Sequence, residues 1–348
     1  MAIGIIGVVG GHCGIEFFPW FQSYRMPLFI FISGYFFKNK EFCSFVLAKI
    51  KHLIIPLLLW NLFFGVLCTL LLHYGLISFG SALSFKTLFI QPFTHGHQFI
   101  LNFATWFVGT LVELQLLYWV LYRICKGNHI FLTLISLVCY WAAYMMADLQ
   151  WHKMYGGCML AAEKVLILLI YYELGYLYRL YWEKKDYFSV NKIAALAIFN
   201  GSIIGFAGGK IWTMYSWMNV ADHAWIPIAV ALSGIYFSLQ IAEYLKDKVG
   251  RNSLFGYIGE HTFSIMTLHV LFLWLLNTVF WKMKEFGWFT LRSFDYDKYM
   301  HLIWFRVTEH EPMAKVFYFL VGLFGSLLCV YLYERFAEPR LKKYFRFL

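Results

Sequence analysis

Residues 53–75 read LIIPLLLWNLFFGVLCTLLLHYG and contain no acidic residue, lysine or arginine. A helix needs about 20 consecutive apolar residues to cross the hydrocarbon core of a bilayer, so this stretch predicts a transmembrane helix. Comparable apolar runs lie on both sides of it, at residues 2–20, 24–37, 105–123, 129–147, 158–181, 190–207, 225–242, 255–281 and 313–336. The sequence therefore predicts an all-α fold: a polytopic membrane helix bundle of about ten transmembrane helices, with residues 1–348 in one membrane-embedded domain.

The composition of the whole chain agrees with a membrane protein. Hydrophobic residues make up 61% of the chain and charged residues 14%, with a mean hydropathy of +0.63, whereas a soluble domain is about 25% charged. This composition excludes a soluble enzyme, a disordered chain and a secreted disulfide scaffold. The net charge of +10 is scattered between apolar runs, so we expect the lipid bilayer and no nucleic acid as a partner. The cysteines form no CxxC pair, which predicts no metal site, and we expect no cleavable signal peptide.

Lysine and arginine are unevenly divided between alternate loops, and this division predicts the orientation. The loop at 182–192 and the C-terminal tail are strongly basic, which places both termini in the cytoplasm. The opposite loops, at 76–104, 208–224 and 282–312, carry histidine, aspartate, glutamine and aromatic residues instead. Such loops suit a carbohydrate, which binds through aromatic faces and side-chain hydrogen bonds.

His12 ends a glycine-rich apolar run, and Glu16 follows four residues later. On a continuous helix these side chains share a face, and a carboxylate beside an imidazole favours a general base. Alternatively, the helix ends near Gly14 and both side chains lie at an interface. We take His12 as a catalytic candidate and Glu16 as a substrate-binding candidate.

Arg25 stands at the mouth of the next run. Few residues separate it from His12, so the two runs must form a hairpin with both side chains at one membrane depth. An arginine there can stabilise an oxyanion or hold an anionic substrate. Its alternative role is that of a snorkelling interface residue.

Further polar side chains interrupt the apolar runs. Lys49, Lys51 and His52 precede the third run, where they suit a phosphate group or serve as ordinary positive-inside anchors. Glu113 and His269 lie within apolar runs, where ionisable groups are functional candidates by default, although a histidine bonded to a carbonyl is the commoner explanation for His269. The remaining candidates for an outer substrate mouth are Asp222, His223 and residues 306–312.

Several segments together resemble integral-membrane acyltransferase family 3, most nearly its fucose 4-O-acetylase-like members. The segments, in chain order, are VVGGHCG (8–14), YRMPLFIFISGYFFK (24–38), KIKHLIIPLLLWN (49–61), TWFVGTLVELQLLYW (105–119) and IGEHTFSIMTLH (258–269). Their order and spacing extend from residue 3 to about residue 335. The stretch MPLFIFISGYFF is the most specific of them, and the pair Trp106–Phe107 is weaker.

The resemblance implies about ten helices and transfer of an acyl group, usually acetyl, from cytoplasmic acyl-CoA to a glycan hydroxyl across the membrane. It implies that His12 is the family's essential histidine. It also implies that Lys49 and His52 occupy the positions of a basic pair found in the family, and that His269 occupies the position of a histidine in one of its last helices. Arg25 stands where the family often has histidine. Family members usually carry a basic residue about eleven positions before the essential histidine, and Met1 is at that position here. Either the natural chain starts further upstream, or it lacks one group expected to hold CoA.

The sequence therefore predicts a membrane O-acetyltransferase of the bacterial cytoplasmic (inner) membrane. Its partners would be acetyl-CoA as acyl donor and a surface polysaccharide or lipid-linked sugar as acceptor, with no tightly bound cofactor. His12 would be general base or acyl acceptor, Arg25, Glu113 and His269 would complete the catalytic set, and Trp106 would contact substrate. The alternatives are a non-enzymatic glycan or glycolipid transporter and a subunit that presents glycans to a separate transferase.

Overall fold

The structure, a computed structural model, describes residues 1–15, 17, 21–209, 213–220, 223–287, 294–307 and 313–339. Within these residues there is no β-strand, only an isolated bridge between Met214 and Asn219. The α-helices are α1 (Ala2–His12), α2 (Phe21–Tyr35), α3 (Phe42–Lys49), α4 (Ile55–His73), α5 (Trp106–Ile124), α6 (His129–Asp148), α7 (Trp151–Tyr155), α8 (Gly157–Leu177), α9 (Val190–Phe206), α10 (Trp225–Leu245), α11 (Leu254–Glu260), α12 (Thr262–Glu285), α13 (Tyr296–His301), α14 (Ala314–Leu320) and α15 (Ser326–Leu332). The predicted all-α fold is confirmed.

Every predicted apolar run contains helix, and several of these helices are long and apolar enough to cross a bilayer. Among the described residues six qualify: Phe42–His73, Ile100–Ile124, His129–Asp148, Trp225–Leu245, Thr262–Glu285 and Ala314–Ala337. The helices α1 and α9 are apolar but shorter. The chain is thus a multi-pass helical membrane protein, and the count of ten spans stays a prediction.

Two predicted runs differ from the structure in their limits. Of the two alternatives for the run at 2–20, a helix that continues to Glu16 or one that ends near Gly14, the second is confirmed: α1 ends at His12, because the chain turns at Gly14, whose φ of 73° is left-handed. The run at 255–281 is broken at His261 into α11 and α12. The Thr262 hydroxyl donates to the carbonyl of Gly259 at 2.8 Å, a local bond that competes with the helical pattern.

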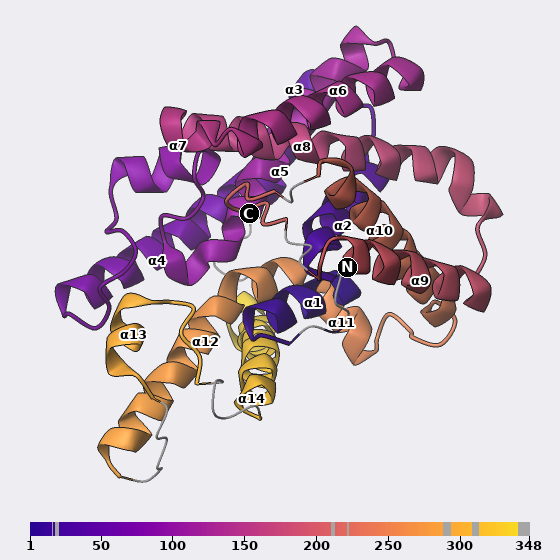
Figure 1. The fold of residues 1–348 in the computed structure, drawn as a ribbon. Helices are drawn as coiled ribbons and strands as arrows, with labels where there is room; N and C mark the ends of the chain where they lie inside the picture. Colours follow the sequence, from indigo (N-terminus) through magenta and orange to yellow (C-terminus); the bar gives the residue numbers. More distant parts are fainter. Residues whose placement is uncertain are drawn as a thin grey trace.

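At the centre of the molecule, α2 lies between α8 and α10 (Figure 1). Glycines on α2 and α8 let the two backbones touch. A Cβ atom on Gly34 would overlap the carbonyl oxygen of Tyr172, and one on Gly175 would overlap that of Phe31. Small residues at such crossings are how membrane helices gain close packing. This contact explains why the most specific motif of the sequence contains Gly34.

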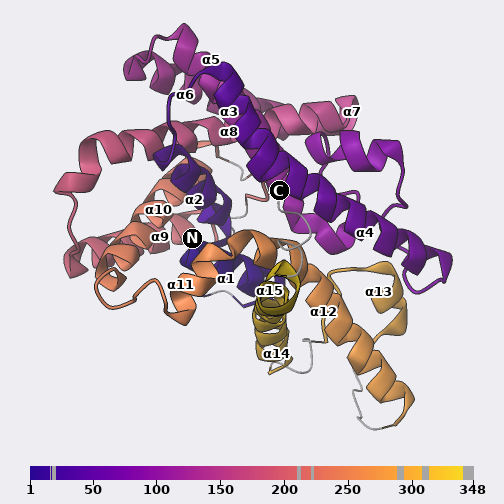
Figure 2. The same ribbon diagram turned by 180° about the vertical axis from the view of Figure 1, so that it is seen from behind.

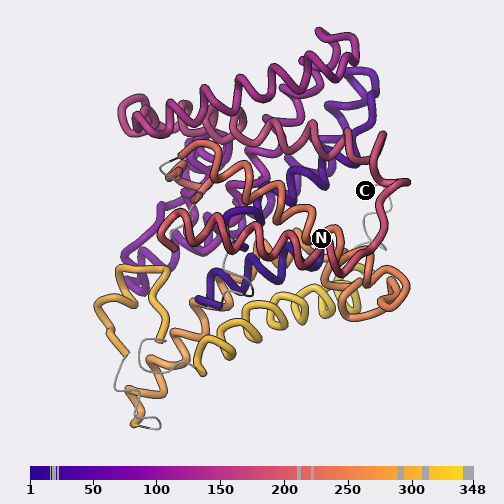
Figure 3. Tube along the Cα trace, turned by 45° about the vertical axis from the view of Figure 1, so that its right-hand side comes forward, coloured from indigo at the N-terminus to yellow at the C-terminus, as the bar shows by residue number. Residues whose placement is uncertain are grey.

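The glycine-rich helix α1 packs against α2, α11 and α12. Its glycines receive side chains from α2: a Cβ on Gly7 would overlap the ring of Phe21, and one on Gly11 would overlap the guanidinium of Arg25. Figure 3 shows the C-terminal helices passing close to α1 on the side away from α8. Helix α1 is therefore enclosed by segments from both halves of the chain.

A second apolar cluster lies beside the main core. It joins α4, the loop at 77–101, α12 and α13, through Phe64, Phe99, Trp274 and Tyr299. Figure 2 shows α4 running along the back of the molecule toward the projecting end of α12 and α13. These elements flank the end of α1 that bears His12.

Candidate active site

The site centres on two histidines that are 257 positions apart in the chain. His12 ends α1, and His269 lies in the middle of α12, fully buried. Nδ1 of His12 lies 2.7 Å from Nε2 of His269. Their rings stack with centroids 5.0 Å apart and planes inclined by 9°. Because α1 packs on α12, the structure brings together two residues that the sequence proposed separately.

The hydrogen bonds around this pair define where the protons are. Nδ1 of His269 lies 2.8 Å from the carbonyl oxygen of Ile265, and a carbonyl can only accept, so this Nδ1 carries a proton. In a neutral ring, Nε2 of His269 is then a hydrogen-bond acceptor, and the Nδ1–H group of His12 donates to it. The neutral His12 ring consequently has its lone pair on Nε2, which is the arrangement that a general base needs.

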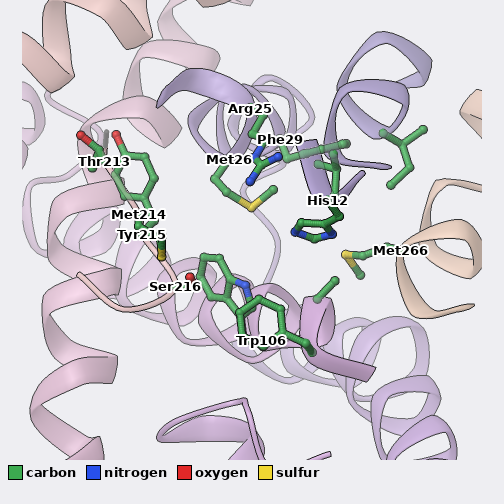
Figure 4. Close-up of a pocket in the computed structure, with 14 residues that line it drawn as sticks. His12, Arg25, Met26, Phe29, Trp106, Thr213, Met214, Tyr215, Ser216 and Met266 are labelled. Carbon is green, nitrogen blue, oxygen red and sulfur yellow. The ribbon is translucent and has the colours of Figure 1, made fainter. Parts of the chain in front are cut away.

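Arg25 extends from α2 toward the same imidazole (Figure 4). The absence of a side chain at Gly11 creates the space that its guanidinium occupies against α1. His12 and Arg25 line one cavity, which holds about 700 Å³ of empty space and is called the His12 cavity here. The hairpin inferred from the sequence does bring the imidazole and the guanidinium together.

The rest of the His12 cavity is formed by apolar side chains and one loop. Met26, Phe29 and Met266 lie on the helices around His12, and Trp106 closes the cavity from α5 (Figure 4). The loop segment 213–216 forms another wall. Trp106, predicted as a substrate contact, therefore lies where a substrate near His12 would touch it.

Two residues of this neighbourhood escaped the sequence analysis as individuals. The ring of Trp304 lies 5.0 Å from that of His12, and Trp304 is 37% exposed. Arg306 donates from Nη1 to the carbonyls of Ile303 and Phe305, while its Nε and Nη2 have no partner among the described residues and are sealed from solvent. Burial lowers the pKa of Arg306 to about 10. The sequence proposed residues 306–312 only as part of an outer mouth, and 308–312 lie outside the described residues.

A second cavity opens on the other side of Phe29, near Met1 at the start of α1. It holds about 1060 Å³ of empty space and is lined by Lys38, Lys40, Lys49 and His52, so it is called the basic cavity here. Phe29 lines both cavities. Of the three predicted phosphate-binding residues, Lys49 and His52 line the basic cavity, whereas Lys51 is exposed and does not line it. Lys38 and Lys40, which the sequence analysis did not single out, line it as well.

Local backbone geometry places the basic residues at this cavity. Pro56 has no N–H to donate one turn back, and the chain before it forms a π-helical segment, Ile50–Ile54, between α3 and α4. Such wide turns are frequent at functional sites. On α2 and α5, Ser33 accepts a hydrogen bond from Gln115 at 2.7 Å, adding polar groups to the cavity wall.

Glu113, the predicted acidic residue that the structure describes, does not line the cavity of the histidine pair. Glu113 lines neither cavity and lies within electrostatic range of the buried Lys164. Nζ of Lys164 donates to the carbonyl of His95 at 3.1 Å and lies 4.8 Å from the ring centre of Trp106. Lys164 and Trp106 thus lie between the charge of Glu113 and the His12 cavity, and the catalytic role of Glu113 stays a prediction. Glu16 and Asp222 lie outside the described residues.

Comparison with known proteins agrees with this geometry. Residues 2–335 match the acyltransferase domain of family 3, which covers nearly the whole chain. The chain belongs to the family of acyltransferase family 3 domains. No curated protein and no solved structure matches the chain. The resemblance inferred from the sequence motifs is therefore confirmed at the level of the family, and the fucose 4-O-acetylase-like subgroup stays a prediction.

Proposed function

We propose that this chain is a membrane O-acyltransferase that moves an acetyl group from acetyl-CoA to a hydroxyl of a glycan. The observation that supports it most is the hydrogen-bonded series from Ile265 through His269 to His12, which leaves Nε2 of His12 free to act as a base beside Arg25. Membership in an acyltransferase family supplies the reaction class.

The separation of the two cavities along α1 favours transfer from one side of the membrane to the other. Met1 lines the basic cavity, and the 11 residues of α1 that lead from there to His12 rise by roughly 16 Å, about half the thickness of a hydrocarbon core. His12 would then lie near mid-membrane when the basic cavity is at the inner surface. The basic cavity opens near Met1, and its lysines suit the phosphates of CoA, while the His12 cavity receives the acceptor from the other face.

In the proposed reaction, Nε2 of His12 accepts the proton of a sugar hydroxyl as the sugar oxygen bonds to the thioester carbonyl carbon. Arg25 stabilises the negative charge that develops on the carbonyl oxygen. The carbon–sulfur bond then breaks, and the sulfur leaves with the proton returned by His12, giving CoA and a sugar ester. In the alternative order, Nε2 bonds to the thioester carbonyl carbon, the carbon–sulfur bond breaks, and CoA leaves as its thiolate. The sugar hydroxyl then attacks the acetyl group on His12, the bond to Nε2 breaks, and the hydroxyl proton passes to the thiolate, giving CoA and the sugar ester.

The finer membrane arrangement belongs to the same proposal. We infer ten spans with both termini in the cytoplasm of a bacterial inner membrane. The basic loop at 182–192 and the basic cavity near Met1 then both face the cytoplasm, as the positive-inside rule expects.

The test is the stoichiometry of CoA release and ester formation. Membranes containing the chain are incubated with radiolabelled acetyl-CoA and a bacterial glycan extract. We expect one CoA thiol for each labelled acetyl ester on glycan. Glycan movement across the membrane without any acetyl-CoA consumption would instead establish the transporter.

A further inference from the structure

A third cavity lies next to the His12 cavity and takes no part in the reaction described above. It holds about 800 Å³ of empty space, and the side chains that line it include Trp217, Asn219, His95, His152 and Lys153. It is called the Trp217 cavity here. An indole with an exposed fraction of 41% stands among amide, imidazole and ammonium groups, a combination suited to a ligand rich in hydroxyl groups.

One short loop separates the two cavities. Residues 213–216 line the His12 cavity, and Trp217 and Asn219 line the neighbouring one. The loop is closed by backbone hydrogen bonds between Met214 and Asn219, of 2.8 and 3.3 Å. A ligand that contacts both faces of this loop would occupy both cavities at once.

A row of rings connects the Trp217 cavity to the base. The centroid of Trp217 lies 4.0 Å from that of His97, which lies 4.7 Å from that of Phe103. The centroid of Phe103 lies 6.4 Å from that of His12. The indole is therefore only a few ring contacts from the reacting nitrogen.

His97, inside this row, has an unused hydrogen-bonding capacity. It is 9% exposed, and neither ring nitrogen has a partner among the described residues. Leaving a buried polar group unpaired costs about 1–3 kcal/mol, so we expect a water to complete it. His97 lines neither cavity, and its ring packs against Trp217 at the cavity wall.

We propose that the Trp217 cavity is a second acceptor subsite, which binds the sugar next to the one that is acetylated. The indole of Trp217 would carry the apolar face of a pyranose ring, and Asn219, His95 and Lys153, which line the same cavity, would exchange hydrogen bonds with its hydroxyls. The acceptor class is then a glycan of two or more sugars rather than a free monosaccharide. This inference rests on the proposed function, because it extends the acceptor side of that reaction.

The experiment compares acceptors of different size. Fractions of a bacterial glycan extract, from monosaccharide to hexasaccharide at equal concentration of reducing ends, receive label from radiolabelled acetyl-CoA. We expect the parent chain to prefer the larger fractions. In Trp217→Ala the ratio of kcat/KM for larger over monosaccharide acceptors should fall about tenfold, the size of a lost aromatic contact.

Trp225→Ala is the matched control, because Trp225 is 44% exposed and lines neither cavity. If the Trp217→Ala variant does not accumulate in the membrane, the same kcat/KM ratio is measured for Asn219→Ala, because Asn219 lines the same cavity. Equal use of all fractions by the parent, or an unchanged ratio in the variants, contradicts this inference alone. No label in any fraction contradicts the proposed function and this inference with it.

Discussion

Nδ1 of His12 lies 2.7 Å from Nε2 of His269, and this contact joins the end of α1 to the middle of α12. It assigns the two histidines different tasks. His12 lines the cavity and has only Nδ1 on His269, whereas His269 uses both nitrogens within the protein, on His12 and Ile265. We therefore expect His269 to act by positioning His12, and its predicted catalytic role stays a prediction.

The first prediction concerns His269. His269→Ala removes the acceptor that holds the proton on Nδ1 of His12, so kcat should fall by about 10²-fold or more. KM for acetyl-CoA should stay within about twofold, because His269 does not line the basic cavity. Steady-state kinetics measure both quantities, with the exposed His223→Ala as control. A rise in KM at unchanged kcat would show that His269 acts on donor binding instead.

The second prediction concerns the glycine that admits Arg25. A methyl group at position 11 would overlap Nη1 of Arg25 and displace the guanidinium from the His12 cavity. Gly11→Ala should therefore lower kcat nearly as much as Arg25→Ala, by about 10²-fold for the loss of one charge-stabilising donor. Gly205→Ala on α9 is the control, because nothing lies within 4 Å of its added methyl. Full activity of Gly11→Ala would show that the reaction does not need the guanidinium of Arg25 at this position.

The third prediction separates neighbouring lysines. Lys49 lines the basic cavity and Lys51 does not, which is the same distinction that the family resemblance makes by matching Lys49 and His52 to a basic pair. Lys49→Ala should raise KM for acetyl-CoA about tenfold, and Lys51→Ala should change it by less than about twofold. Equal effects of the two substitutions would mean that CoA is held by general surface charge.

The fourth prediction concerns the crossing of α2 and α8. Gly175→Ala places a methyl group against the carbonyl of Phe31 and should destabilise the fold by about 1–3 kcal/mol through overpacking. Thermal unfolding in detergent micelles measures the change, with Gly201→Ala, whose methyl has open space, as control. An equal unfolding temperature for both variants would contradict the close backbone contact.

The fifth prediction concerns Asp186, outside the predicted spans. Burial alone would raise the pKa of Asp186, but hydrogen bonds from Lys192, Tyr236 and Tyr178 outweigh it and lower the pKa below the usual 3.8. A carboxyl group whose pKa is lower in the folded than in the unfolded chain stabilises the fold at pH values above its unfolded pKa. This stabilisation is lost as the pH falls through the pKa of the folded chain.

Asp186→Asn should therefore lower the unfolding temperature at pH 7, and the difference from the parent should shrink below about pH 4. The exposed Asp247→Asn provides the control. A difference that stays constant with pH would assign the effect to hydrogen-bond geometry rather than to charge.

The sequence predicted the helical class, the apolar runs and the pairing of His12 with Arg25, because hydropathy and short chain separations report these directly. Contacts between distant segments have no such pattern. Nothing local indicates that His269 reaches His12, since the bond depends on how α1 packs on α12. Glycine has a low helix propensity, yet two glycines of α1 provide the space that Phe21 and Arg25 occupy.

The residues of the basic cavity could be predicted only in part from the sequence. A charge near a membrane surface has the same sequence pattern whether it anchors a helix or lines a cavity. Lys38 and Lys40 therefore looked like anchors, and Lys51 looked like a ligand. Which of these charges lines a cavity depends on how the helices pack, and the sequence does not show that packing.

The most direct test of the account is acetyl transfer by a chain that lacks the base. Membranes with equal amounts of the parent or the His12→Ala variant receive radiolabelled acetyl-CoA and a bacterial glycan extract, and labelled ester on glycan is counted. We predict that the variant loses transfer by at least about 10³-fold while it still binds acetyl-CoA. Transfer by His12→Ala at the rate of the parent would contradict the central claim.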